Sequence, residues 1–174
     1  MGHGKLRPAV LDSGPLIHLA EIGCLRLLRI FESLCIPQAV WLETFGQNRI
    51  SQNDLGAELN IQHYSVPRSE LVNFIAKGNL TELHGGEQEC LFLCQQREIS
   101  VLLTDDMAVR DAARRLKLVP VGSLGIVVAA YEHELISRQH AERCIADLYD
   151  VSSLFVTRDL VDLAIENLRL HPKH

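Results

Sequence analysis

Short apolar segments of strand length alternate with amphipathic segments of helix length along most of the chain, and this alternation limits the possible folds more than any other feature. The strand candidates are residues 8–12, 33–37, 61–66, 100–104 and 119–121. Helical patterns separate them, which is typical of α/β domains built on a parallel sheet. The sequence therefore predicts an α/β fold with a central, mainly parallel sheet of four to five strands.

Glycine and proline punctuate the helical segments at their ends. Gly14-Pro15 opens the segment after the first strand and Gly23 closes it, as helix start and stop signals do. Residues 46–60 are rich in Gln, Asn, Ser, Gly and Asp, and we expect a loop there that follows a frayed helix end. Further helices are expected over residues 24–31, 37–48 (with Pro37 at the first helical position), 69–78, 85–98, 106–118, 122–136, 137–148 and 158–169.

Length and charge narrow the class of protein. The 174 residues, 47% of them hydrophobic, suit one compact domain with a substantial core. No apolar run approaches the roughly 20 residues of a membrane helix, and no apolar signal-peptide core precedes Asp12, so we expect a cytoplasmic protein. The net charge of −5 argues against a polybasic nucleic-acid binder. An acidic protein can still bind a polyanion where its carboxylates hold divalent cations.

The five cysteines, at positions 24, 35, 90, 94 and 144, mostly have apolar neighbours in the sequence. They form no Cys-x-x-Cys motif, and their number is odd. Cys90 and Cys94 lie one helical turn apart, which is a zinc spacing only if two further soft ligands join them. We interpret all five as buried, reduced thiols of a cytosolic protein.

Acidic residues follow the predicted strands at the positions where α/β sheets bind ligands. In such sheets, ligands bind outside the carboxyl ends of the strands, at the point where the strand order reverses. Asp12 ends the first strand, and Asp105 and Asp106 follow the strand over residues 100–104. If these two strands are neighbours, the three acids meet at one edge. Glu43 and Glu87 lie on helical segments that could face the same edge.

Carboxylates gathered in this way repel one another unless a cation lies among them. Two like charges about 4 Å apart cost roughly 4 kcal/mol at an effective dielectric constant near 20. Hard oxygen ligands in this number suit Mg²⁺ or Mn²⁺ and not zinc. Such ions can generate hydroxide from water and hold the oxygens of a phosphodiester. The acids therefore predict a divalent-metal site for phosphodiester chemistry.

Each acid also has an ordinary structural interpretation when taken alone. Asp12 and Asp106 are suitable residues to cap the helices that follow them. Glu43 could be a solvated helix residue, and Glu87 could satisfy the positive end of its helix. It is the order and the local contexts of the four acids together that favour a functional site.

Basic and histidine side chains near the acid pair allow two interpretations. Arg110 and Arg114 are four residues apart on one helical segment, so they share a face. They could bind substrate phosphates, or they could lie on a solvated face paired with Asp111. His18 and His84 could flank the site, although a lone histidine on an apolar helix is more often structural.

The chain resembles the PIN-domain family over most of its length, from about residue 8 to residue 136. Three blocks carry the resemblance: "AVLDSGPLIHLAEIGCLRLL", "IPQAVWLETF" and "LHGGEQECLFLCQQREISVLLTDDMAVRDAARRLKLVPVGSLGIVVAAYEHELI". The nearest branch is that of VapC-like toxin ribonucleases of type II toxin–antitoxin systems. The resemblance implies a PIN-like three-layer α/β/α fold in a single domain, 1–174, with a core over about 8–136 and a C-terminal helical extension over about 137–170.

The family's acidic positions fall on acidic residues of this chain. The third family position often carries Asp; here it is Glu87, whose side chain is one methylene longer. Many members place the fourth acid two residues after the threonine, and Ser13 and Thr104 match small hydroxyl positions that hold waters or orient the acids. Carried over in order, the four acids are Asp12, Glu43, Glu87 and either Asp106 or its neighbour Asp105.

The resemblance implies an endoribonuclease that depends on Mg²⁺ or Mn²⁺. Asp12 and the pair Asp105–Asp106 would bind the principal ion, and Glu87 would complete its shell or take a second ion. Glu43 would position or deprotonate the attacking water. In-line attack on phosphorus would leave 5′-phosphate and 3′-hydroxyl ends.

The resemblance also implies an RNA substrate, a small antitoxin protein and a homodimer as partners. The apolar residues of the tail helices are consistent with a dimer interface or an antitoxin groove. The alternative is a PIN-fold binding or assembly module with little or no nuclease activity. The complete set of acids favours the enzyme.

Overall fold

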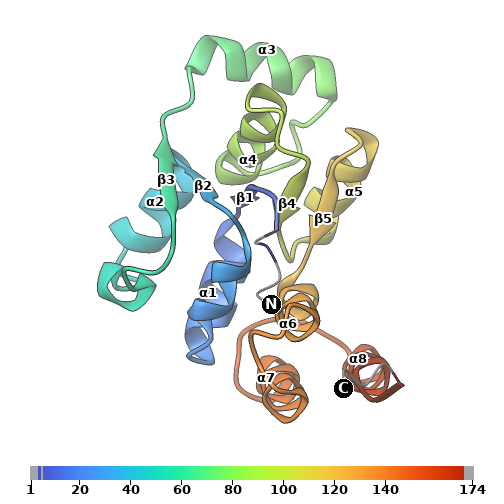
Figure 1. The fold of residues 1–174 in the computed structure, drawn as a ribbon. Coiled ribbons are helices and arrows are strands. Elements are labelled where there is room, and N and C mark those ends of the chain that lie inside the picture. Colours follow the sequence, from blue (N-terminus) through green and yellow to red (C-terminus); the bar gives the residue numbers. More distant parts are fainter. Residues whose placement is uncertain (1–3, 5, 171–174) are drawn as a thin grey trace.

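The structure, a computed structural model, describes Gly4 and residues 6–170. Within these residues five strands form one all-parallel sheet in the order β3-β2-β1-β4-β5, as Figure 1 shows. The predicted α/β fold with a central parallel sheet is therefore confirmed. The strands are β1 (Ala9–Leu11), β2 (Leu34–Pro37), β3 (Ile61–Tyr64), β4 (Val101–Leu103) and β5 (Val119–Val121).

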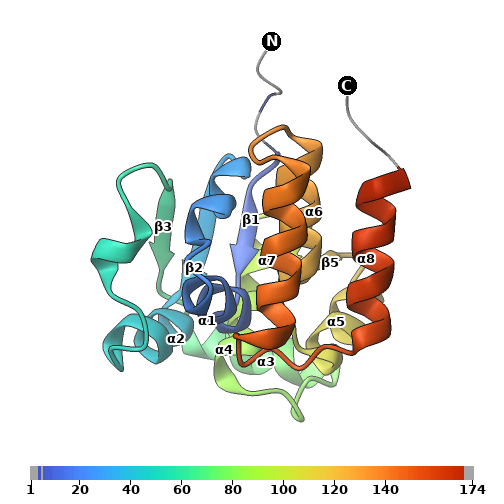
Figure 2. The same cartoon turned by 90° about the horizontal axis from the view of Figure 1, so that it is seen from below.

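Helices cover both faces of the sheet, which gives the three layers that the resemblance implied (Figures 1 and 2). Helix α4 packs against β1, β2 and β4 on one face, with α3 outside it. On the other face α6 contacts α1 and η1, α7 packs on α6, and α8 packs on α7. The helices are α1 (Ser13–Glu21), η1 (Leu25–Ile30), α2 (Gln38–Trp41), η2 (Leu42–Gly46), η3 (Gln52–Leu55), α3 (Arg68–Gly78), α4 (Gly85–Gln96), α5 (Met107–Arg115), α6 (Ser123–Glu132), α7 (Arg138–Asp150) and α8 (Arg158–Leu170).

The core is centred on β1, whose three residues are completely buried. A strand covered by helices on both sides needs apolar residues on both of its faces, and the sequence Ala-Val-Leu of β1 satisfies this. The same hydrophobic cluster continues into the C-terminal helices through Ile145 and Leu148 of α7 and Val161 and Leu168 of α8. The C-terminal helices are therefore packed onto the core.

The segment that carries Glu43 differs from the single helix predicted over residues 37–48. Pro37 is the last residue of β2 and lies in extended conformation, so it precedes the helix and is not its first residue. After the four residues of α2 the backbone widens into the π-helical turn η2. The Thr44 hydroxyl donates to the Val40 carbonyl at 2.7 Å and supports this turn. Sequence periodicity does not distinguish such a turn from α-helix.

Two other segments are also locally different from expectation. The predicted helix over residues 24–31 is the tighter 3₁₀-helix η1, which Gly23 precedes with a positive φ of 66°. The predicted loop over residues 46–60 contains the short 3₁₀-helix η3, with Ser51 as its capping residue. The ends of the predicted domain, at residues 1–3, 5 and 171–174, lie outside the described residues.

All five cysteines are buried and free, so the interpretation as buried thiols is confirmed. None of the described helices has the length and apolar character needed to cross a bilayer.

Replacing Leu91 by alanine tests the core. Leu91 is completely buried on α4, which packs on three strands, so Leu91→Ala is expected to lower the free energy of unfolding by about 2–5 kcal/mol. Val72→Ala, at a position that is 55% exposed on α3, should change it by less than about 0.5 kcal/mol. Urea denaturation followed by circular dichroism measures both. Equal losses in the two variants would contradict this packing.

Candidate active site

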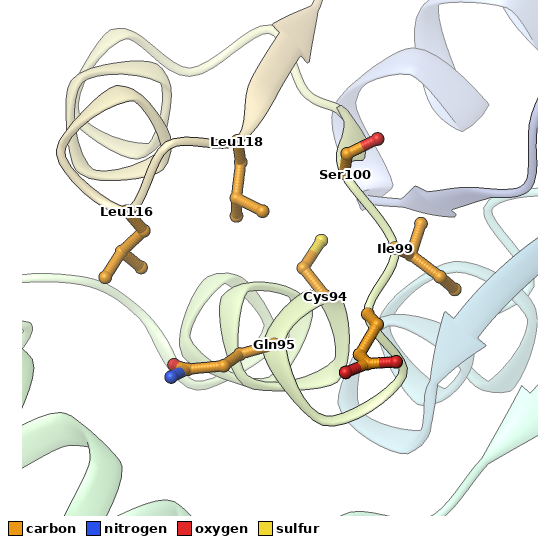
Figure 3. Close-up of a pocket in the computed structure, with 7 residues that line it drawn as sticks. Cys94, Gln95, Ile99, Ser100, Leu116 and Leu118 are labelled. Carbon is orange, nitrogen blue, oxygen red and sulfur yellow. The ribbon is translucent and has the colours of Figure 1, made fainter.

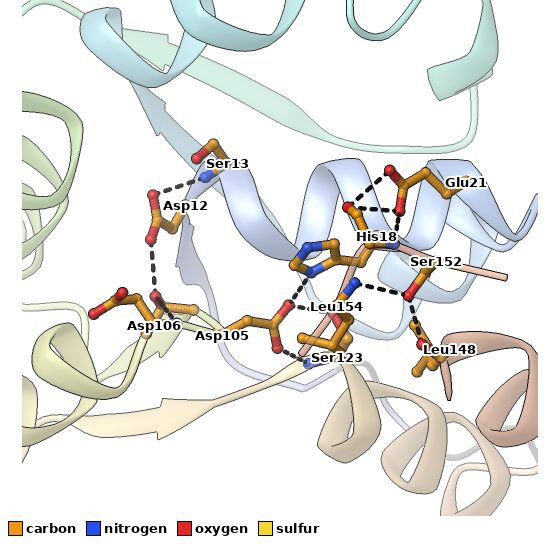
Figure 4. Close-up of polar contacts among 12 residues, drawn as sticks. Asp12, Ser13, His18, Glu21, Asp105, Asp106, Ser123, Leu148, Ser152 and Leu154 are labelled. Atoms are coloured by element: carbon orange, nitrogen blue, oxygen red, sulfur yellow. Dashed lines mark hydrogen bonds and ion pairs between the residues drawn. The ribbon is translucent and has the colours of Figure 1, made fainter. Parts of the chain in front are cut away.

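The parallel pairing of β1 with β4 positions the first acid. Leu11 pairs with Leu103, so Asp12 and Thr104 leave the sheet side by side. The Asp12 backbone N–H donates to the Leu103 carbonyl at 3.0 Å. The Thr104 hydroxyl donates to Asp12 Oδ2 at 2.8 Å, and the Ser13 N–H donates to Asp12 Oδ1 at 2.7 Å (Figure 4). Both oxygens of the Asp12 carboxylate are therefore held in a fixed orientation.

Burial makes the negative charge of Asp12 unfavourable. The residue is only 4% exposed, and the pKa of its carboxyl is raised from 3.8 to about 6, chiefly by desolvation. The hydrogen bonds from Thr104 and Ser13 oppose this rise. The charges of Glu87 and Glu43 raise the pKa further. Asp12 therefore lies within the electrostatic reach of two acids that are distant in the sequence.

Glu87 occupies the first turn of α4 and belongs to the same group of acids. Its Oε2 accepts a hydrogen bond from the His84 backbone N–H at 2.8 Å. Burial raises the pKa of Glu87, the bond from His84 opposes this, and the charges of Asp106 and Glu43 raise it again. The charges of these acids thus act on Asp12 or on Glu87. We call the four residues Asp12, Glu43, Glu87 and Asp106 the acid cluster.

Glu43 lies on the turn η2 at the more open side of the acid cluster. Its side chain is 41% exposed, and its Oε1 lies 3.7 Å from Nη1 of Arg49. Glu89, a second acid of α4, holds α2 in place, because the N–H of Ala39 in α2 donates to Oε2 of Glu89 at 2.9 Å. A Cβ atom added at Gly86 would lie 3.7 Å from Oε2 of Glu43. The start of α4 is therefore close to the turn that carries Glu43.

The adjacent residues Asp105 and Asp106 point in different directions (Figure 4). Asp106 caps α5, with Oδ1 accepting from the Val109 N–H at 3.0 Å. Asp105 contacts His18 of α1, with Nδ1 of the ring 2.7 Å from Oδ2. It also accepts from the Ser123 N–H at 2.7 Å and from the Ser123 hydroxyl at 2.6 Å. Asp105 therefore joins α1 to the start of α6, whereas the charge of Asp106 acts on Glu87 within the acid cluster.

Sequence reasoning missed Ser123, which is completely buried and donates twice to Asp105. The available signal is Gly122-Ser123 at the start of the helix after β5. A Cβ at Gly122 would lie 2.9 Å from Oδ1 of Asp105 and 3.0 Å from Nη1 of Arg110. A larger residue at position 122 would therefore have to displace the side chain of Asp105 or of Arg110. His18 was expected to flank the site, and its contact is with Asp105.

The other predicted site residues have structural partners. The Arg110 guanidinium donates through Nη1 to the Thr104 carbonyl at 3.2 Å, so it supports the end of β4. Arg114 is exposed and donates to Asp111 at 2.8 Å, as its ordinary interpretation proposed. Ser13 contacts Asp12 through its backbone N–H. Binding of substrate by these residues stays a prediction.

The four carboxylates are not gathered into one tight group. In the part of the chain that the structure describes, no three of their carboxylates bring oxygen atoms within 4.8 Å of one another. Mg²⁺ usually keeps several waters and binds through one or two carboxylates. An open cluster of this kind therefore suits a hydrated divalent ion better than it suits a fully dehydrated one.

A pocket of about 260 Å³ lies at the opposite edge of the sheet (Figure 3). Ser100 and Leu118, which precede β4 and β5, line it together with Cys94, Ile99 and Leu116. These residues are at the amino ends of the strands, and the acid cluster is at the carboxyl ends. The pocket is therefore not part of the candidate active site.

Comparison with known proteins gives one family. The profile of the family DUF3368, described as a PIN domain, matches residues 8–169. No curated protein and no solved structure gives a significant match.

The raised pKa of Asp12 predicts a pH-dependent cost to stability. Folding favours the protonated carboxyl, so stability is lost as the pH rises from 3.8 through about 6. That shift corresponds to about 3 kcal/mol. Without divalent ions, the free energy of unfolding of Asp12→Asn at pH 7.5 is expected to exceed that of the wild type by at most about 3 kcal/mol. This difference in the free energy of unfolding should fall towards zero as the pH is lowered to about 4.

Urea denaturation in chelator across this pH range measures the effect. Asp111→Asn, which removes an exposed carboxylate, serves as the control and should show no such trend. A difference between Asp12→Asn and wild type that stays constant with pH would contradict the assignment.

Proposed function

The chain belongs to the PIN-domain family, and on this premise we propose that it is a Mg²⁺- or Mn²⁺-dependent endoribonuclease that hydrolyses RNA at the acid cluster. PIN domains are generally nucleases, and they typically use divalent metals. The observation that carries the proposal is the buried carboxylate of Asp12, whose pKa is raised by its burial and by the charges of Glu87 and Glu43. A site that concentrates uncompensated negative charge in this way is suited to a cation.

The proposed ligands are Asp12, Glu87 and Asp106. Among the hydrogen bonds of residues 6–170, Asp106 uses Oδ1 and Glu87 uses Oε2, so each retains a second oxygen for a metal or its waters. All three offer hard oxygen atoms. When bound, one or two Mg²⁺ or Mn²⁺ ions would offset the negative charge of the phosphodiester and stabilise the charge that develops during its hydrolysis.

Glu43 is proposed to act on water. Its half-exposed side chain can reach solvent that the buried Asp12 cannot. A carboxylate oxygen of Glu43 would orient a water molecule and accept its proton as the water oxygen attacks phosphorus. The bond from phosphorus to the 3′ oxygen would break in line, and the departing 3′ oxygen would take a proton from solvent, which leaves 5′-phosphate and 3′-hydroxyl ends. Thr104 is proposed as a positioning residue, because it fixes Asp12.

We further propose that the protein is the toxin of a toxin–antitoxin pair and that its C-terminal region contacts a partner. Large apolar side chains are exposed along this region, and Phe155 is 95% exposed. Leu160, Leu163 and Leu170 add to this surface on α8. A second copy of the chain or a small antitoxin would cover them. Arg114, on the exposed side of α5, is proposed to meet RNA phosphates.

Cleavage of generic RNA by purified protein tests the nuclease. Activity is expected with Mg²⁺ or Mn²⁺ and not in excess chelator. Asp12→Asn and Glu87→Gln are each expected to lower the rate by about 10²-fold or more, because the loss of charge weakens metal binding and transition-state stabilisation. Asp111→Asn, which removes a carboxylate outside the acid cluster, should retain full activity. Equal activity in Asp12→Asn or in chelator would identify a contaminating nuclease and reject the proposal.

The adjacent aspartates provide a matched pair of variants. Asp106→Asn retains a good helix cap, so its stability should be nearly unchanged while its Mn²⁺ affinity and activity fall. Asp105→Asn removes the charge that faces His18 and presents an amide to the donors of Ser123, so it should lose about 1–3 kcal/mol of stability. Urea denaturation and Mn²⁺ titration by electron paramagnetic resonance measure both properties. A folded Asp105→Asn that loses Mn²⁺, beside an Asp106→Asn that retains it, would reverse the assignment.

A further inference from the structure

A second group of metal-binding side chains lies away from the acid cluster, and we propose that Cys24, His140 and Cys144 form a Zn²⁺ site. Two sulfur atoms and one ring nitrogen of these residues all lie within 4.8 Å of one another. His140 and Cys144 are one turn apart on α7, and Cys24 comes from the segment between α1 and η1. The site therefore joins two segments that lie 120 residues apart in the chain.

This group is separate from the acids. Asp12 precedes α1 and Cys24 follows it. The nine residues of α1 span about 14 Å at 1.5 Å per residue. The chemistry also differs, because two thiols and an imidazole are soft or borderline ligands that select zinc, whereas the carboxylates of the acid cluster select Mg²⁺ or Mn²⁺.

The geometry is close to that of a tetrahedral zinc site. The two sulfur atoms are 3.2 Å apart. Tetrahedral zinc with bonds of about 2.3 Å to sulfur places two sulfurs about 3.8 Å apart, so a small side-chain rotation would admit the ion. Three protein ligands leave the fourth position to water, the arrangement of an open zinc site. Cys24 and Cys144 are buried and His140 is half-buried, so solvent reaches the site from the histidine side.

The hydrogen bond between the two thiols affects them in opposite ways, because it lowers the pKa of Cys24 and raises that of Cys144. Zinc takes thiols as thiolates and imidazole in its neutral form, so binding would release protons from the site. Two thiolates would balance the charge of Zn²⁺. The negative charge of Asp147 acts on both thiols and offsets the nearby arginines.

Cobalt provides a spectroscopic test in the intact protein. With excess Mg²⁺ present to occupy the carboxylates, one equivalent of Co²⁺ should give thiolate-to-metal charge-transfer absorption and the visible bands of tetrahedral cobalt, and Zn²⁺ should displace it. Cys144→Ser and His140→Gln should each lower Zn²⁺ affinity by about tenfold or more. Mutation of a residue that only hydrogen-bonds to a metal ligand already lowers affinity by about this factor, and the loss of the ligand itself should lower it at least as much. Cys35→Ser, which removes a buried thiol outside the group, should bind as the wild type does.

Three results would overturn the proposal. They are the absence of charge-transfer absorption in wild-type protein, a Cys144→Ser variant that keeps both the wild-type intensity of this absorption and the wild-type affinity, and a Cys24–Cys144 disulfide found by mass spectrometry in protein kept under thiol reductant. Far-ultraviolet circular dichroism establishes that each variant is folded before it is compared. His140→Gln retains both thiols, so it reports on ligation even where a cysteine variant fails to fold. None of these results depends on nuclease activity.

Discussion

The pairing of β1 with β4 is the constraint on which the rest of the molecule depends. The two strands are about 90 residues apart in the sequence, yet Leu11 pairs with Leu103 in parallel register. Because both strands end at the same edge of the sheet, Asp12 contacts Thr104, and the residues that follow the two strands contribute to one site. A shift of this register by one residue would turn Asp12 to the other face of the sheet. The hydrophobic burial of both strands therefore also fixes the position of the first acid.

The fold supports the acid cluster by placing hydrogen-bond donors and helix starts beside it. Asp12 lies at the start of α1, Glu87 in the first turn of α4 and Asp106 at the start of α5. The positive ends of three helices therefore face the acids and favour their charges. Burial outweighs this effect at Asp12, whose pKa remains raised. The site thus retains an electrostatic cost that a divalent cation would remove.

The sequence predicted the sheet and most helices, because apolar periodicity and glycine or proline punctuation are local signals, whereas the three layers were implied by the family resemblance. It also placed the acids at strand ends and helix starts. It could not separate Asp105 from Asp106, since their directions depend on His18 and Ser123, which come from other elements. The sequence also could not predict the π-helical turn that carries Glu43, because its apolar spacing differs little from that of an α-helix. The group of Cys24, His140 and Cys144 depends on packing between segments that no spacing rule connects.

The C-terminal helices contribute to the geometry of the acid cluster through a closed series of contacts. Asp105 ties His18 of α1 to Ser123 of α6. Helix α6 packs against α7, and α7 carries Cys144, which contacts Cys24 just after α1. Because α1 starts at Asp12 and Asp105 is adjacent to Asp106, any displacement of α7 must either break one of these contacts or move the acids. The C-terminal extension is therefore part of the framework of the site, and a metal bound between Cys24 and α7 would stiffen that framework at the end of α1 opposite to the acids.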